Sequence, residues 1–170
     1  MNKLASRRAF LRGRVLRPDR STIRPPGAVD HIFFELCHDC DDCVQACPQD
    51  IITIDAQGWP EVRFEDAACT FCGDCADACP TGALDRDRVS DWPWRASFAA
   101  TCLSKNGVTC RICQDICDRD ALRFRLQLGG RSEPVLDMDA CTGCGACAGA
   151  CPVRAIGFER PTQDRPEVSA

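Results

Sequence analysis

Four groups of cysteine at nearly constant spacing constrain this chain of 170 residues more than any other feature. In three of them, gaps of two, two and three residues separate the cysteines, and a proline follows the last one. These runs comprise Cys37, Cys40, Cys43 and Cys47; Cys69, Cys72, Cys75 and Cys79; and Cys141, Cys144, Cys147 and Cys151. The remaining group has seven residues in its first gap and Asp118 in place of the proline; it comprises Cys102, Cys110, Cys113 and Cys117. Together the groups use all 16 cysteines.

The spacing discriminates between the three chemistries that use many cysteines, which are disulfides, structural zinc and iron–sulfur clusters. Zinc is held by two cysteine pairs with a longer loop between them, so that four ligands meet at one ion. Disulfides need no such rhythm, and no secretion signal indicates an oxidising compartment. Three cysteines at every third residue suit a loop wrapped around a cubane, in which each thiolate binds a different iron. We therefore predict [4Fe–4S] clusters, because soft thiolate ligands disfavour harder metals.

The fourth cysteine of such a run normally ligates the other cluster of a pair. The sequence therefore predicts four clusters in two crossed pairs. The predicted ligand sets are Cys37, Cys40, Cys43 and Cys79; Cys69, Cys72, Cys75 and Cys47; Cys102, Cys110, Cys113 and Cys151; and Cys141, Cys144, Cys147 and Cys117. At the stretched group that begins with Cys102, a three-iron or labile cluster is the alternative.

The repeats predict an α+β fold in which two bacterial-type 2[4Fe–4S] ferredoxin-like halves follow one another, loop-rich and with short hairpins and short helices. We expect a basic disordered arm, the first half, a linker, the second half and a disordered tail, at 1–30, 31–84, 85–101, 102–160 and 161–170. Turn residues between apolar segments predict hairpins at Gln57–Gly58 and Gly129–Gly130. Short helices are expected to begin between the third and fourth cysteine of each group.

The supply of large apolar side chains is small, because Leu, Ile, Val and Phe together make up about a fifth of the chain. A chain of this composition is not expected to fold on burial alone, so the clusters are expected to act as its core. A small or aliphatic pair after each fourth cysteine is expected to pack over the clusters: Ile51–Ile52, Ala83–Leu84, Ala121–Leu122 and Ala155–Ile156. No uncharged apolar stretch approaches the length of a membrane-spanning helix, so no stable membrane insertion is expected.

Charge is distributed unevenly, with eight basic residues and one acidic residue in 1–24 of a chain whose net charge is −4. The arm is expected to dock on an acidic surface and the acidic remainder on a basic one, while nucleic acid binding is not expected. Ser6–Arg7–Arg8 with Arg12 is similar to a twin-arginine export motif, which makes these arginines candidate partner-binding residues. The apolar segment that such a signal needs does not follow, so we predict that the protein is not exported.

The arm with Ser6–Arg7–Arg8, the stretch Ile23–Arg24–Pro25–Pro26 and the four cysteine groups in this order, with the third stretched, resemble the NapF family of ferredoxin-type proteins. The resemblance covers nearly the whole chain. It implies a cytoplasmic protein, encoded with periplasmic nitrate reductases, that acts on the catalytic molybdenum subunit before export. The implied role is to help assemble or reduce that subunit's own [4Fe–4S] cluster, with the 16 cysteines as cluster ligands and no catalytic residue.

Two other functions are open at this point. Four clusters in one chain also suit an electron-transfer subunit of a membrane-bound oxidoreductase, although such subunits are usually longer. A general soluble ferredoxin or cluster carrier is the other alternative. An enzyme is not expected, because every cysteine is assigned to a cluster and none is left as a nucleophile.

Overall fold

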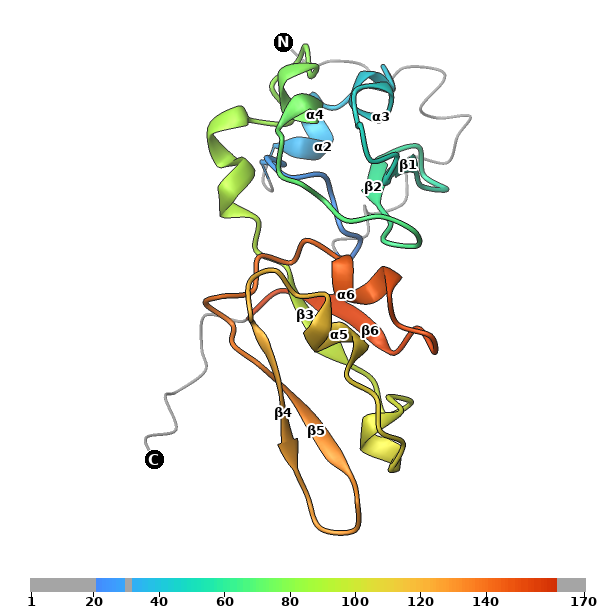
Figure 1. The fold of residues 1–170 in the computed structure, drawn as a ribbon. Helices are drawn as coiled ribbons and strands as arrows, with labels where there is room; N and C mark the ends of the chain where they lie inside the picture. The colour runs from blue at the N-terminus through green and yellow to red at the C-terminus, as the bar shows by residue number, and fades with distance from the viewer. Residues whose placement is uncertain (1–20, 30–31, 162–170) are drawn as a thin grey trace. The chain divides into compact units, whose positions relative to one another are not determined.

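Short elements joined by long connections make up residues 21–29 and 32–161, the part of the chain that the computed structural model describes (Figure 1). The predicted α+β class, with short hairpins and short helices in a loop-rich chain, is confirmed. The chain divides into two units between Trp92 and Pro93. Within the described residues, no helix is long and apolar enough to cross a membrane.

The first unit contains α2 (Phe33–Leu36), α3 (Asp42–Gln45), β1 (Ile52–Ile54), β2 (Pro60–Val62), α4 (Asp74–Asp77) and the 3-10 helix η1 (Arg86–Asp91). Strands β1 and β2 pair antiparallel, with Ile52 opposite Val62. The turn between them is closed by Asp55, whose Oδ1 accepts hydrogen bonds from the backbone N–H of Gln57 and of Trp59. The hairpin predicted at Gln57–Gly58 is therefore confirmed.

Residues 21–29 pack into the first unit, so the prediction that a disordered arm extends through residue 30 is wrong for this segment. The backbone N–H of Val62 donates to the Ile23 carbonyl at 2.8 Å, and that of Asp85 donates to the Gly27 carbonyl at 2.8 Å. A Cβ at position 27 would lie 2.5 Å from the Asp85 carbonyl oxygen, so this approach requires glycine. The rest of the predicted arm, including Arg7, Arg8 and Arg12, lies outside the described residues, as does the predicted tail beyond residue 161.

Arg24 anchors this N-terminal segment although it belongs to the basic stretch. Its Nη1 lies 2.7 Å from Asp55 Oδ2, and only 5% and 6% of the two side chains are exposed. The same Nη1 donates to the Pro60 carbonyl, and the guanidinium carbon lies 5.3 Å from the centre of the Phe34 ring. The indole N–H of Trp92 donates to the Arg24 carbonyl at 3.1 Å. A buried ion pair of this kind is strongly destabilising to break, because the remaining charge is left without a partner.

The second unit contains β3 (Arg95–Phe98), the 3-10 helix η2 (Ser104–Asn106), α5 (Ile112–Asp115), β4 (Leu122–Leu126), β5 (Ser132–Leu136), α6 (Ala146–Gly149) and β6 (Ile156–Glu159). Strands β3 and β6 pair antiparallel from Arg95 opposite Glu159 to Phe98 opposite Ile156. Strands β4 and β5 form a longer hairpin, with its turn at Gly129–Gly130, as predicted.

The segment 85–101, expected to be a linker, contains η1 and β3 and is shared between the units. Trp92 is buried in the first unit, where its ring lies 6.0 Å from that of Phe64 and 5.4 Å from that of Phe71. Trp94 is buried in the second unit, with the guanidinium carbon of Arg160 at 4.8 Å from its ring centre. These aromatic side chains attach the two ends of the segment to the two units.

Each third cysteine lies in a short helix, which starts earlier than the predicted position between the third and fourth cysteine. Helices α3, α4, α5 and α6 each begin one residue before Cys43, Cys75, Cys113 and Cys147, respectively. In the three regular runs the residue before the helix has a left-handed backbone, with φ of 59° at Asp41, 84° at Gly73 and 91° at Gly145. In the stretched group the corresponding residue, Arg111, has a φ of −135°. The chain therefore enters the helix of the stretched group with a different backbone conformation.

Candidate metal centres

The third cysteine of each group is the most enclosed thiol. Burial raises the pKa of the Cys43, Cys75 and Cys147 thiols to about 12 and that of Cys113 to about 11, because a buried thiolate loses its hydration. Neighbouring thiols add to each increase in pKa. Charges act on one another in this way only at short range, so these neighbours show which cysteines the fold brings together.

In each unit, the fourth cysteine of one group lies beside the first three of the other. The thiols that act on Cys43 include Cys37, Cys40 and Cys79, and those that act on Cys75 are Cys69, Cys47 and Cys72. In the second unit, Cys102, Cys110 and Cys151 act on Cys113, and Cys144, Cys141 and Cys117 act on Cys147. Cys75 also acts on Cys43, and Cys113 on Cys147, so the two thiol sets of each unit are neighbours.

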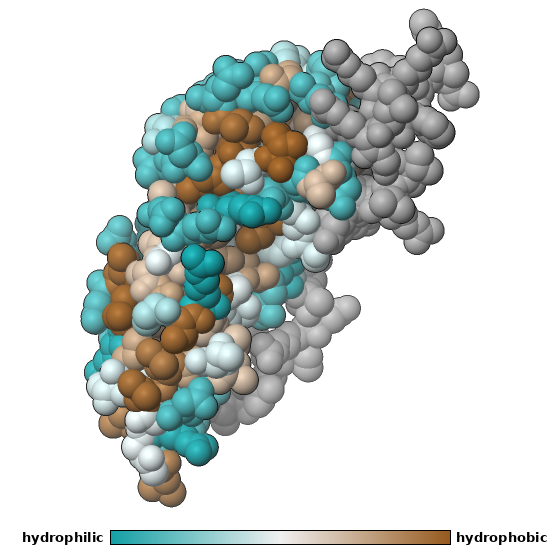
Figure 2. All heavy atoms as spheres, turned by 90° about the vertical axis from the view of Figure 1, so that its right-hand side faces the viewer, coloured by the Kyte–Doolittle hydropathy of each residue, from teal (hydrophilic) through white to brown (hydrophobic). Residues whose placement is uncertain are grey.

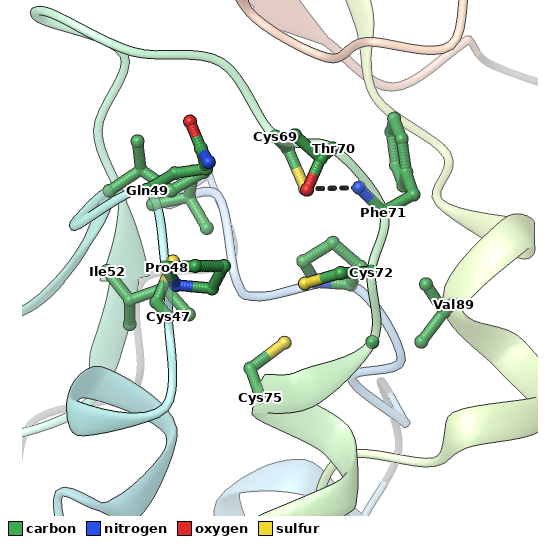
Figure 3. A pocket seen from close by; sticks show the side chains of 14 residues that line it. Cys47, Pro48, Gln49, Ile52, Cys69, Thr70, Phe71, Cys72, Cys75 and Val89 are labelled. Atoms are coloured by element: carbon green, nitrogen blue, oxygen red, sulfur yellow. Dashed lines mark hydrogen bonds between the residues drawn. The ribbon is translucent and has the colours of Figure 1, made fainter.

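A partly open cavity of about 370 Å³ lies inside one of these sets in the first unit. Cys47 faces Cys69, Cys72 and Cys75 across it (Figure 3). Apolar side chains make up most of the remaining wall: Pro26, Pro48, Ile51, Ile52, Val62, Phe71 and Val89. Pro26 belongs to the N-terminal segment, so this segment helps to close the cavity.

The second unit has two cavities of the same kind. One, of about 370 Å³, is lined by Cys117, Cys141, Cys144 and Cys147 together with Leu122, Leu136 and Phe158. The other, of about 350 Å³, is lined by Cys102, Cys110, Cys113 and Cys151 together with Phe98, Phe124 and Ile156. The stretched group thus contributes all of its first three cysteines to a cavity that resembles the others.

The walls of the cavities fit an iron–sulfur cluster. None of the described residues that line the three cavities is a carboxylate or a histidine, so the ionisable ligands they offer are the soft thiols. Within residues 21–29 and 32–161, no three His, Cys, Asp or Glu side chains converge closely enough to hold a single metal ion. The thiols surround a space instead, as required when each binds a different iron.

Two backbone hydrogen bonds to sulfur come from the residue pairs that were expected to pack over the clusters, and a third runs from the N–H of Phe71 to Cys69 Sγ. The N–H of Leu84 donates to Cys79 Sγ at 3.5 Å, and that of Ala155 donates to Cys151 Sγ at 3.3 Å. Burial acts to raise the pKa of Cys79, but hydrogen bonds from Leu84, Thr81 and Ala83 outweigh it, so the pKa lies below its ordinary value. Such bonds favour the thiolate and help to set the potential of a bound cluster.

The insertion between Cys102 and Cys110 is held by side chains that the sequence analysis did not single out. Ser104 is buried, and its hydroxyl donates to the Cys110 carbonyl at 2.6 Å. The Asn106 amide donates to the Cys102 carbonyl and to the Ala100 carbonyl, both at 2.8 Å. The backbones of both cysteines are therefore fixed from within the insertion. The polar residues Ser104, Lys105 and Asn106 inside the long gap are the only sequence signal that could have indicated these bonds.

Arg86 is a second residue that the sequence analysis missed. Its Nη1 donates to the Cys72 carbonyl at 2.5 Å and lies 3.0 Å from Asp77 Oδ2. A Cβ at Gly73 would collide with this guanidinium, so the glycine makes room for it. Cys72 and Cys40 are the exposed cysteines, whereas the other 14 are half-buried or buried. Arg86 thus contacts the backbone of one of the two most exposed cysteines.

Comparison with known proteins identifies the class of protein that has these cysteine-lined cavities. The chain matches the 4Fe-4S dicluster domain family over residues 36–83 and again over 108–155. Each match covers one pair of cysteine groups, except that Cys102 lies outside the second because of the insertion. The chain is therefore a ferredoxin-type iron–sulfur protein with two dicluster domains in tandem.

Individual relatives show which family of ferredoxin-type proteins the chain is similar to. The chain is 41% identical over 161 residues to the ferredoxin-type protein NapF of Haemophilus influenzae, covering 88% of this chain and 91% of the relative. It is 41% identical over 156 residues to NapF of Escherichia coli, with 91% and 94% covered. The ferredoxin-type protein NapG of Escherichia coli is 33% identical over 151 residues, with 76% and 65% covered. The chain belongs to the NapF family, as its motifs predicted, and is an electron-transfer or accessory iron–sulfur protein rather than an enzyme.

Proposed function

We propose that the 16 cysteines hold four [4Fe–4S] clusters in the crossed sets predicted from the sequence. The proposed ligands are Cys37, Cys40, Cys43 and Cys79; Cys69, Cys72, Cys75 and Cys47; Cys102, Cys110, Cys113 and Cys151; and Cys141, Cys144, Cys147 and Cys117. The proximity of the thiols in each set and the three apolar cavities support this assignment. A bound cluster supplies a one-electron donor or acceptor.

The stretched set is included as a complete four-thiol site. Ser104 and Asn106 hold the carbonyls of Cys110 and Cys102, so the long gap does not leave either cysteine without support. This arrangement favours a [4Fe–4S] cluster over the three-iron alternative.

We further propose that the protein acts in the cytoplasm on the catalytic molybdenum subunit of a periplasmic nitrate reductase before its export. It binds that subunit and assists its maturation, by assembly or by reduction of the subunit's own [4Fe–4S] cluster. The observation that carries the proposal is the similarity to NapF proteins over about nine-tenths of both chains. The neighbouring thiol sets in each unit suit this role, because adjacent clusters can exchange electrons.

An anaerobic capture experiment with the tagged full-length chain and the signal-bearing catalytic subunit tests the function. We expect the catalytic subunit to be recovered together with about 16 iron atoms per chain, as four clusters of four irons require. Replacement of Arg7, Arg8 and Arg12 by Ala is expected to weaken recovery without loss of iron. Replacement of Arg14, Arg17 and Arg20 by Ala is the matched control, since it removes the same charge from the same arm.

The outcomes separate the competing functions. Recovery of a membrane oxidoreductase in fixed stoichiometry, without the catalytic subunit, would favour an electron-transfer subunit. Cluster donation to several unrelated apoproteins would favour a general carrier. Failure to recover the catalytic subunit with fully loaded protein would contradict the proposed function.

A further inference from the structure

The hairpin of β4 and β5 is longer than the cavities of the second unit require. Leu122, Leu136 and Phe124 line the cavities, so the base of the hairpin belongs to their walls. Beyond the base, 76% of Leu126 and 99% of Leu128 are exposed. Figure 1 shows the hairpin projecting from its unit, and Figure 2 shows apolar and polar side chains side by side at its free end. The outer half of the hairpin therefore has no part in holding the thiols.

The two edges of this hairpin differ. On the β5 side, Pro134 has no N–H to offer. A short helix lies close to each strand, η2 to β5 and α5 to β4. On the β4 side, no strand pairs with the outer edge within the described part of the chain. The N–H of Gln127 donates to Arg131 and that of Asp137 to Ala121, so odd-numbered residues of β4 face β5. The backbone groups of Phe124 and Leu126 therefore point outward, since the inward and outward bonds of an antiparallel pair alternate.

Side chains along the same edge alternate between charge and apolar surface. Arg123 and Arg125 lie on one face of β4, whereas Phe124 and Leu126 lie on the other. All three arginines of the hairpin, including Arg131 beside the turn, are exposed. Among the described residues, no ion pair engages any of their guanidinium groups. Glu133 lies opposite Arg125 in the register, and its carboxylate accepts a hydrogen bond from the Gln127 amide at 2.8 Å.

We propose that the outer edge of β4 binds an extended segment of a partner protein in which acidic and apolar residues alternate. The segment would join the sheet as a third strand, with its backbone bonded to the outward groups of Phe124 and Leu126. Its acidic side chains would lie beside Arg123 and Arg125, and its apolar side chains beside Phe124 and Leu126. This interaction goes beyond the proposed maturation role and does not depend on it.

A protein segment fits this edge better than an anionic membrane surface does. A strand edge offers directed donors and acceptors at a fixed spacing, which another strand matches and lipid head groups do not. The exposed arginines also oppose self-pairing of two such hairpins, because like charges would meet across the new edge. The charges along this edge therefore favour pairing with an acidic strand and disfavour pairing with the same edge of a second copy.

The test uses the full-length, cluster-loaded protein and a fluorescent peptide of alternating Glu and Val, with an alternating Lys and Val peptide as its charge control. We expect the Glu–Val peptide to bind, and Arg123→Glu with Arg125→Glu to weaken binding by about tenfold or more. Leu126→Pro removes one outward N–H and is expected to weaken binding similarly. Ser132→Pro is the matched control, because it removes an outward N–H from the other edge and is expected to leave binding unchanged.

Several results would overturn the proposal. These are no binding of the Glu–Val peptide to the unmodified protein, equal binding of both peptides, or equal effects of Leu126→Pro and Ser132→Pro. Binding to phosphatidylglycerol vesicles in place of the peptide would identify a membrane surface instead. The double arginine variant lies on the solvent-facing side of β4, so it keeps the test decisive if Leu126→Pro does not fold. Iron content and circular dichroism establish that each variant is loaded and folded.

Discussion

In each unit, the segment before the first cysteine packs against the residues that follow the last cysteine, but different contacts hold it there. In the first, the N–H of Val29 donates to the Ala83 carbonyl, and in the second, the N–H of Ala99 donates to the Ala155 carbonyl. Each bond joins the segment before a unit's first cysteine to the residue pair that follows its last one. In the second unit this contact extends into the β3–β6 ladder, but in the first it is a single bridge between Ala28 and Leu84.

In the first unit, side-chain contacts hold the closing segment where the backbone pairing is shorter than in the second unit. Arg24 pairs with Asp55 in the interior, and the Trp92 indole binds the Arg24 carbonyl. The second unit has no such pair among its described residues, and it relies on β3–β6 and on the Ser104–Asn106 insertion. The comparison indicates that cysteine spacing determines the cavities, whereas the closing segment can vary as long as it is fastened.

Iron removal is expected to have the largest effect, and it tests whether the clusters form the core of both units. We expect chelation under oxidising conditions to abolish the cooperative unfolding transition of both units, because thiols and apolar walls are left around empty space. Calorimetry and circular dichroism of the stripped and the rebuilt protein measure this. Cooperative melting of either unit without iron would show that its closing segment, rather than its clusters, forms the core.

Arg24→Ala tests the fastening peculiar to the first unit. The expected loss is about 3–5 kcal/mol, because Asp55 is left buried without its partner. The signals of the clusters in the first unit should weaken in electron paramagnetic resonance spectra, while those of the second persist. Arg63→Gln is the control, since its ion pair with Glu61 lies at the surface and little change is expected.

A double variant checks the cause of that loss. Arg24→Met with Asp55→Asn removes both charges and keeps an oxygen that can accept from the N–H of Gln57 and Trp59, so it is expected to be more stable than Arg24→Ala alone. If it is no better, the packing of the Arg24 stem against Phe34, and not the unpaired carboxylate, accounts for the loss.

Ser104→Ala tests the fastening peculiar to the stretched set. Loss of the bond to the Cys110 carbonyl is expected to cost about 1–3 kcal/mol locally. We expect the cluster of this set to convert to a three-iron form on mild oxidation while the other three persist, which iron content and electron paramagnetic resonance report. Ser104→Thr keeps the hydroxyl and should restore the site. Ser97→Ala, in β3, should have no such effect.

The smallest expected effect concerns charge near two regular runs. Asp39, Asp41 and Asp42 lie between the cysteines of the first run, whereas the run that begins at Cys141 encloses no charged residue. We expect the first cluster to have the lower potential, because nearby negative charge disfavours an added electron. Asp39→Asn with Asp41→Asn should raise it by a few per cent of the roughly 1 V range of such clusters. Redox titration with the reverse order would contradict this.

Much of the architecture follows from short-range signals in the sequence. The cysteine spacing predicted two dicluster halves in tandem, and Gln57–Gly58 and Gly129–Gly130 predicted both hairpins. The two halves were expected to begin at residues 31 and 102, but each unit includes an earlier segment that closes it, because that segment precedes the first cysteine. Arg24 pairs with Asp55 at a separation of 31 residues, so its burial could not be inferred from the basic stretch around it. Ser104 and Asn106 gave no periodic signal, since their role is to accommodate an insertion.

The N-terminal segment of the first unit is synthesised before everything to which it binds. Ile23 bonds to Val62, Gly27 to Asp85 and Val29 to Ala83. Pro26 lines the cavity together with residues that are synthesised after it. At about 5–20 residues per second, the ribosome needs roughly 3–12 seconds to advance from Arg24 to Asp85. During that interval the nascent chain presents its cysteines before the segment can close over them. The segment therefore cannot complete its bonds to the unit until Asp85 has been synthesised.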